Sequence, residues 1–467
     1  MSGLLLRDAE IGGSERADVR VAGGLIAEIG GGLARVPGER ALECGGGALL
    51  PGLCDHHLHL HALAARRHSV PCGPPEVTGP DGLAAALRDA VPDGHGWVRG
   101  TGYAESVAGD LDAAAIDALR PDGPVRVQHR SGALWILNSA AVRAAGLASA
   151  GHPGIERDAA GRPTGRLWRA DGWLRTRLPA ARPVDLGAVG RELARLGVTA
   201  VTDATPDLGA EAAASIEAAV RDGSLPQRVH LLGLPPDART GPHPRLGTGP
   251  YKIVLADSGL PALDDLADRI RLVHGHGRPV AVHCVTREAL LLLLAALDET
   301  GTLNGDRVEH AALVPPETVA DLAERGLRVV TQPGFLADRG DDYLRDVPAA
   351  DVPDLYRYRS LLAAGVPVGL SSDAPYGPLD PWAVMAAAAD RTARSGTVVG
   401  RDETVPAAAA LRSLLTAPDD PGGLPRKVSV GGAADLVLLH VPLNEALRRP
   451  SAGDVRATIA DGRLVQE

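Results

Sequence analysis

The sequence predicts an α/β protein built on a TIM-type (β/α)8 barrel, with a large insertion after the first barrel strand and a small discontinuous β-sandwich formed by both chain ends. Three observations predict this architecture. Short β-branched runs alternate with Ala/Leu-rich helical stretches through the middle of the chain, as in parallel βα units. Both ends alternate apolar and polar residues, as strands do. The 467 residues are long enough for two or three domains, at roughly 100–200 residues each.

The two ends are predicted to pair with each other. Residues 17–30 read as a hairpin about Gly23-Gly24, and residues 455–467 read as a hairpin about Asp461-Gly462. Residues 427–441 read as strand, glycine turn and strand. Neither end has enough strands for a stable sheet alone, so residues 1–51 and 405–467 are expected to form one composite domain.

The barrel is expected over residues 52–404, because eight β-rich runs occur in and around this segment. The runs are residues 48–60, 198–206, 228–234, 251–257, 279–285, 307–313, 328–334 and 366–375. The gap between the first two runs is much longer than one helix needs, which predicts an inserted subdomain at about residues 68–185.

Composition excludes several classes of protein. The net charge of −10 and the lack of a basic block disfavour nucleic acid and anionic membrane as partners. The longest apolar run, residues 289–297, is too short to span a bilayer and reads as a buried helix. The N-terminus has no basic segment of the kind that begins a secretory signal. Four sparse cysteines favour reduced thiols in the cytoplasm. A homodimer is left open.

The strongest motif is Asp55-His56-His57-Leu58-His59, at the end of the first barrel run. Because side chains alternate along a strand, His57 and His59 share one face and His56 lies on the other. Two imidazoles on one face at the carboxyl end of a barrel strand are placed to bind a metal ion.

Other potential ligands close further runs at the same end. They are His283, His310 and Asp373, with Lys252 inside the fourth run. Only two of the 48 basic residues are lysines, Lys252 and Lys427, and a charged Lys252 would be costly to bury. By the same alternation, Glu309 is expected to face away from His310 and to pair with Arg307 or a neighbouring strand.

The ordered series PGLCDHHLHL, YKIVLAD, AVHC, RVEHA, TQP and SSDAPYGPLDPW resembles the amidohydrolase superfamily, in particular its YtcJ-like branch, which includes N-substituted formamide deformylases. LNSAAVRAAGL followed by GRPTGRLW is similar to the insertion of that branch. The resemblance covers nearly the whole chain.

The resemblance implies a site with one or two divalent ions, usually zinc. It places His57, His59 and Asp373 on one metal, His283 and His310 on the other, and an N6-carboxylated Lys252 as the bridge. The alternative for Lys252 is a cationic side chain that points away from the metals. The implied reaction is hydrolysis of a non-peptide C–N bond in an amide or formamide-type small molecule. Metal ions lower the pKa of bound water from 15.7 to about 7 and so supply hydroxide, and Asp373 acts as general base and acid.

The residues around the implied metal set differ from the family pattern. Ala133 stands where relatives commonly have a histidine, which leaves the substrate open. The candidate substrate contacts are His129, Trp135, His230 and Gln332, and His230 either lines the pocket or fills the core. A deaminase of a nitrogen heterocycle is the closest alternative, but Thr286 occupies the position where such enzymes usually carry a glutamate. A non-catalytic scaffold would be expected to have lost ligands, and this chain retains every expected one.

Overall fold

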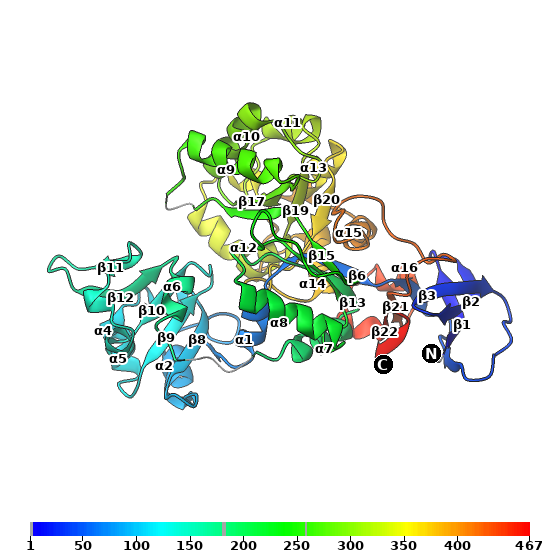
Figure 1. The fold of residues 1–467 in the computed structure, drawn as a ribbon, viewed down its shortest axis with the longest axis horizontal. Coiled ribbons are helices and arrows are strands. Elements are labelled where there is room, and N and C mark those ends of the chain that lie inside the picture. Colours follow the sequence, from blue (N-terminus) through cyan, green and yellow to red (C-terminus); the bar gives the residue numbers. More distant parts are fainter. Residues whose placement is uncertain (1–2, 180–183, 257–258) are drawn as a thin grey trace. The chain divides into compact units, whose positions relative to one another are not determined.

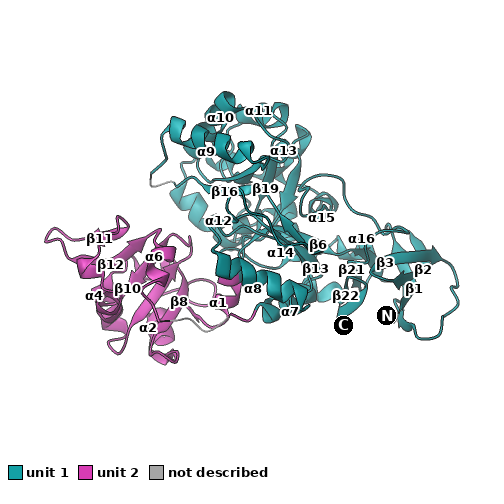
Figure 2. Cartoon of the chain, in the orientation of Figure 1, with its two compact units in different colours: residues 1–60, 186–467 teal, residues 61–185 magenta. Residues whose placement is uncertain are grey.

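The chain divides into two compact units in a computed structural model that describes residues 3–179, 184–256 and 259–467. One unit contains residues 1–60 and 186–467, and the other contains residues 61–185 (Figure 2). Asp257, which ends the fourth predicted run, and residues 180–183 of the predicted insertion lie outside the described residues.

Strands from both chain ends share one eight-stranded sheet in the first unit (Figure 1). Its order is β23-β22-β21-β5-β1-β2-β3, and β4 pairs with β1. The central join is antiparallel pairing of β21 with β5. The strands are β1 (Leu4–Ile11), β2 (Glu15–Ala22), β3 (Leu25–Gly30), β4 (Arg40–Glu43), β5 (Ala48–Pro51), β21 (Leu436–Leu439), β22 (Val455–Ala460) and β23 (Arg463–Gln466).

The turn residues explain the two hairpins of this sheet. Gly23 and Gly24 have φ of 59° and 80°, and Asp461 and Gly462 have φ of 50° and 73°. Two successive positive φ values are required by the type I′ turn, whose twist matches that of paired strands. The prediction of a strand at residues 427–430 is wrong. Val428 is partly buried against the core of this sheet, but Val430 is 62% exposed, so the apolar alternation there buries only one of its two valines.

The parallel strands form two sheets rather than one continuous closed sheet. The order of the first is β15-β14-β13-β6, and that of the second is β16-β17-β18-β19-β20. Each of the eight predicted runs contains one of these strands, and β15 is additional. The strands are β6 (Leu53–Leu58), β13 (Val198–Asp203), β14 (Arg228–Leu231), β15 (Leu246–Thr248), β16 (Tyr251–Val254), β17 (Val280–Cys284), β18 (Arg307–His310), β19 (Arg328–Thr331) and β20 (Val368–Leu370).

Hydrogen bonds connect these two sheets at both sides. The Lys252 N–H donates to the carbonyl of Leu232 at 3.1 Å, which joins β16 to the end of β14. The Asp373 N–H donates to the carbonyl of His57 at 2.8 Å, which joins the segment after β20 to β6. Pro250 separates β15 from β16 and has no N–H to donate, so the ladder is interrupted there.

Helices connect the parallel strands, and α9 and α10 pack on β17 (Figure 1). The Thr286 hydroxyl caps α10 by accepting from the Ala289 N–H at 3.3 Å, and the predicted buried apolar run lies in this helix. No helix in the described ranges has the length and hydropathy needed to cross a membrane. The helices of this unit are α7 (Leu186–Arg195), α8 (Ala210–Arg221), α9 (Leu263–Gly275), α10 (Arg287–Thr300), α11 (Thr318–Glu324), α12 (Gly334–Asp346), α13 (Tyr358–Ala363), α14 (Pro381–Asp390), α15 (Ala407–Leu414) and α16 (Leu443–Ala446). The helix α1 (Leu60–Arg66) belongs to the second unit apart from its first residue (Figure 2).

The second unit has its own sheet, in the order β11-β12-β10-β9-β8-β7, and its own apolar clusters. Its strands are β7 (Val70–Pro71), β8 (Val98–Tyr103), β9 (Val125–His129), β10 (Leu134–Leu137), β11 (Ile155–Arg157) and β12 (Pro163–Trp168). Its helices are α2 (Pro80–Asp89), α3 (Glu105–Ala108), α4 (Ala113–Leu119), α5 (Ser139–Ala144) and α6 (Asp171–Arg175).

Candidate metal centre

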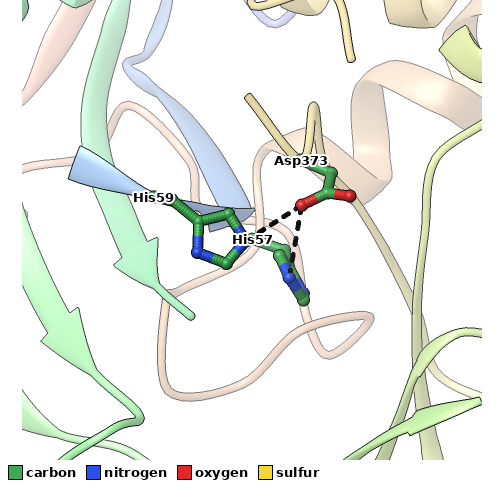
Figure 3. A group of neighbouring side chains, drawn as sticks. All are labelled: His57, His59 and Asp373. Carbon is green, nitrogen blue, oxygen red and sulfur yellow. Dashed lines mark hydrogen bonds and ion pairs between the residues drawn. The ribbon is translucent and has the colours of Figure 1, made fainter. Parts of the chain in front are cut away.

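Three potential metal ligands meet where β6 and β20 end (Figure 3). One ligand atom from each of His57, His59 and Asp373 lies within 4.8 Å of the others. Asp373 Oδ1 is 3.1 Å from Nε2 of His59 and 3.5 Å from Nε2 of His57. Two imidazole nitrogens and a carboxylate oxygen are a donor set that zinc and similar divalent ions accept. The residues present therefore fit a divalent metal ion.

The backbone around these ligands is held by Asp55. Its carboxylate accepts hydrogen bonds from the Ser372 hydroxyl at 2.5 Å and from the His57 N–H at 3.1 Å. Burial raises the pKa of Asp55 to about 7, although these hydrogen bonds act in the opposite direction. Asp373 has a φ of 54°, an uncommon conformation for a residue other than glycine. The contacts between β6 and the segment after β20 hold the Asp373 carboxylate toward the two imidazoles.

Three further side chains complete the cluster. The His310 ring centroid is 4.8 Å from that of His57 and 4.4 Å from that of His283. Lys252 is 2% exposed, and its Nζ lies 3.5 Å from Nε2 of His57. The six residues predicted from the sequence as metal ligands therefore converge from β6, β16, β17, β18 and the segment after β20.

Burial favours neutral forms of several of these groups. It lowers the pKa of Lys252 to about 8, although the carboxylates of Glu309 and Asp373 oppose the change. It also holds the pKa values of His57 and His310 well below the usual histidine range. Neutral imidazole is the form that binds a metal ion, and a neutral amine is the form that reacts with CO2.

Hydrogen-bond partners outside the cluster engage Nδ1 of three of its histidines. Glu309 contacts Nδ1 of His57 through Oε2. The Thr205 hydroxyl lies 3.3 Å from Nδ1 of His59, and Gln332 Oε1 lies 2.9 Å from Nδ1 of His310. Such partners fix the tautomer and orientation of a ligating imidazole. Because Nδ1 of His57 and of His59 is engaged in this way, the Nε2 atom of each ring faces Asp373.

Glu309 and His310 both contact His57, so Glu309 reaches the cluster although it was not predicted from the sequence as a site residue. His310 has a φ of 69°, so strict alternation fails at the end of β18. Glu309 does pair with Arg307, as the sequence suggested. Sequence reasoning missed Glu309 and Thr205 as site residues. The only available signal for Glu309 was a carboxylate next to a candidate ligand.

Gln332 lies beside the cluster, and both ends of its amide are engaged. Its Oε1 contacts His310, and its Nε2 donates to the Ser371 hydroxyl at 2.9 Å. His230 is not brought to the cluster. It lines a cavity of about 460 Å³ together with Pro279, which precedes β17, and Arg307, the first residue of β18.

His129 and Trp135 belong to the second unit. The His129 Nε2 lies 3.0 Å from a Glu105 carboxylate oxygen. Trp135 is 4% exposed and donates from Nε1 to Asp171 at 2.7 Å. Their contact with substrate stays a prediction. The Cys284 thiol is buried and contacts the carbonyl of Ala289.

A family model described as "Amidohydrolase family" matches residues 40–466, so the chain belongs to this family. It is a hydrolase, of the class that acts on C–N bonds other than peptide bonds. The resemblance noted in the motifs is confirmed.

Two curated relatives agree with this assignment. The chain is 27% identical to an N-substituted formamide deformylase of Arthrobacter pascens, over 96% of this chain and 94% of that protein. It is 26% identical to the putative amidohydrolase YtcJ of Bacillus subtilis (strain 168), over 74% of each chain. Among solved structures, an uncharacterized metal-dependent hydrolase from Pyrococcus horikoshii OT3 shares the fold, with a TM-score of 0.74, 17% identity and coverage of 99% of this chain and 100% of that one.

Proposed function

We propose that this protein is a metal-dependent hydrolase of a non-peptide C–N bond in a small amide or formamide-type molecule. The observation that carries the proposal is the convergence of His57, His59 and Asp373 within 4.8 Å, with Lys252 and two more histidines beside them. The relative named N-substituted formamide deformylase supports a formamide-type substrate.

We assign the ligands as follows. His57, His59 and Asp373 would hold one divalent ion, for which we propose zinc, and His283 and His310 would hold a second. Lys252 would bridge them as a carbamate, formed when its neutral amine adds CO2 and releases a proton. Support comes from its burial, its pKa of about 8 and its 3.5 Å separation from Nε2 of His57.

The bound ions supply Lewis acidity and lower the pKa of a water molecule. Side chains of the protein carry out the remaining steps. The Asp373 carboxylate accepts a proton from the attacking water and returns it to the leaving nitrogen, and this transfer contributes typically ~10²–10⁴-fold. A C–O bond forms and the C–N bond breaks, which releases an amine and a carboxylic acid.

The deaminase alternative has less support. The residue at the position of the expected glutamate, Thr286, uses its hydroxyl to accept from the Ala289 N–H at 3.3 Å. A threonine engaged as a helix cap is not a proton shuttle. A heterocyclic deaminase would need another acid at this site.

We also infer the architecture around the site. The two parallel sheets are halves of one (β/α)8 barrel, with β15 and β16 together forming one strand position. The Lys252–Leu232 and Asp373–His57 backbone bonds support this closure. The domain proposal is a composite domain of residues 1–51 and 405–467, a barrel over 52–404 and an insertion at about 68–185.

The experiment is a hydrolysis assay with a panel of N-substituted formamides, N-acyl amines, cyclic amides and aminated nitrogen heterocycles. Amine release from an amide should be lost with a chelator and restored by Zn²⁺ or Mn²⁺. Ammonia release from heterocycles alone would favour the deaminase. Activity that a chelator cannot remove, even after prolonged dialysis, would contradict metal dependence.

A further inference from the structure

We infer that Glu309, supported by Arg307, is a positioning residue that directs Nε2 of His57 into the metal centre. Its side chain is fully buried, and Oε2 contacts Nδ1 of His57. The other carboxylate oxygen, Oε1, lies 2.5 Å from Nε of Arg307. A single carboxylate thus joins a buried cation to a proposed metal ligand.

The contact with Glu309 defines the tautomer of His57. An ionised carboxylate only accepts hydrogen bonds, so Nδ1 carries the proton and Nε2 keeps its lone pair. Nε2 is the atom that faces Asp373 and Lys252, at 3.5 Å from each. A neutral imidazole held in the other tautomer would present an N–H to these groups and would have no lone pair for a metal ion at this nitrogen.

Arg307 lies directly against Glu309 in the interior. Burying a carboxylate is costly, and a close guanidinium offsets part of that cost. Arg307 is 2% exposed, and its Nη2 also donates to the carbonyl of His56 at 3.4 Å. The two residues are two apart on β18 and so lie on one face of that strand. The pair is therefore built into the strand that ends in His310.

The inference rests on the proposed metal centre, and the experiment separates the two. Glu309→Gln removes the charge with little change in volume. Glu299→Gln is the matched control, because Glu299 also pairs with an arginine, Arg271 at 3.2 Å, but on the surface of α10. Dissociation constants for Zn²⁺ and Co²⁺ are measured on demetallated full-length protein by competition with a chromogenic chelator, and the visible spectrum of the Co²⁺ form is recorded.

Glu309→Gln should weaken metal binding by roughly 10–100-fold and alter the Co²⁺ spectrum, while Glu299→Gln should match the wild type. A purely structural role would lower the thermal unfolding midpoint without changing the affinity of the folded molecules. If Glu309→Gln does not fold, Glu309→Asp retains the charge but is too short to reach both partners, and weaker binding is again expected. Wild-type affinity and spectrum in a folded Glu309 variant would overturn the inference and leave the hydrolase proposal standing. Failure of the wild type to bind either ion would overturn both.

Discussion

Lys252 is the residue whose chemistry distinguishes the proposed bridge from an ordinary buried cation. A primary amine with a lowered pKa can form a carbamate, whereas arginine stays protonated and cannot. The chain otherwise uses arginine almost throughout, since its only other lysine is Lys427. Lys252 lies beside His57, at the position where the proposed bridge requires an amine.

Lys252→Ala should lose the second metal ion and the hydrolytic activity, because the anionic bridge is removed. A short carboxylic acid such as propionate should restore part of the activity by occupying the vacated space. Lys427→Ala is the control, since Lys427 is exposed and distant in sequence from every proposed ligand. Metal content measured by mass spectrometry checks the prediction, and unchanged content in Lys252→Ala would refute the bridge.

His230 predicts a pH dependence of stability that is separate from catalysis. Burial, followed by the charge of Arg307, lowers its pKa to about 4 from the ordinary 6.5. Between about pH 6.5 and 4, the unfolded chain therefore binds a proton at His230 that the folded chain does not bind. The stabilisation is fully present above pH 6.5 and is lost as the pH falls toward 4. Its upper limit is about 3 kcal/mol, at 1.36 kcal/mol per pKa unit.

His230→Asn removes this titration. Urea unfolding between pH 7.5 and 4.5 should show a smaller loss of the free energy of unfolding in the variant than in the wild type. The other histidines titrate equally in both proteins, so the difference isolates His230. Parallel pH profiles would show that His230 does not titrate in this way.

At the scale of elements, one buried carboxylate connects the terminal sheet to β14 and β15. Asp435 precedes β21 and is 2% exposed. It pairs with Arg228 at 2.8 Å and Arg245 at 2.9 Å, and it accepts from the Asp461 N–H at 2.8 Å. Asp435→Ala would leave these donors without their acceptor.

Asp435→Ala should lower the free energy of unfolding by about 3–5 kcal/mol, the usual cost of breaking a buried ion pair from one side. Asp158→Ala is the comparison, because Asp158 pairs with the exposed Arg162. The comparison variant should unfold close to the wild type in urea. A small effect of Asp435→Ala would mean that water replaces the carboxylate at this junction.

The elements also show what could be predicted from sequence. Each predicted barrel run contains a strand, and His57 and His59 share a face, because alternation is a local property. The contact of Glu309 with His57 was not predicted, because it joins two strands that are 252 residues apart in sequence and no local pattern encodes it. Residues 427–430, where a strand was wrongly predicted, do alternate apolar and polar side chains. Whether one face of such a segment is buried depends on its tertiary neighbours, which the local sequence does not specify.

At the scale of the whole molecule, the proposed metal ligands all belong to one unit, residues 1–60 and 186–467. Binding to the folded state alone stabilises a protein by about 2.7 kcal/mol at 100 times the dissociation constant. Added Zn²⁺ should therefore slow amide hydrogen exchange in β6, β16, β17 and β18. Amide hydrogen exchange in the strands of residues 61–185 should slow less. If Zn²⁺ protected only the strands of residues 61–185, the metal would bind outside the proposed centre.

The central claim is that His57, His59 and Asp373 form a metal centre, and metal stoichiometry tests it most directly. Purified wild-type protein, or demetallated protein given Zn²⁺ or Mn²⁺, should carry at least one equivalent of divalent ion. The double variant His57→Ala/His59→Ala should lose that equivalent while remaining folded by circular dichroism. Wild-type protein that holds much less than one equivalent and takes up neither added ion would contradict the account.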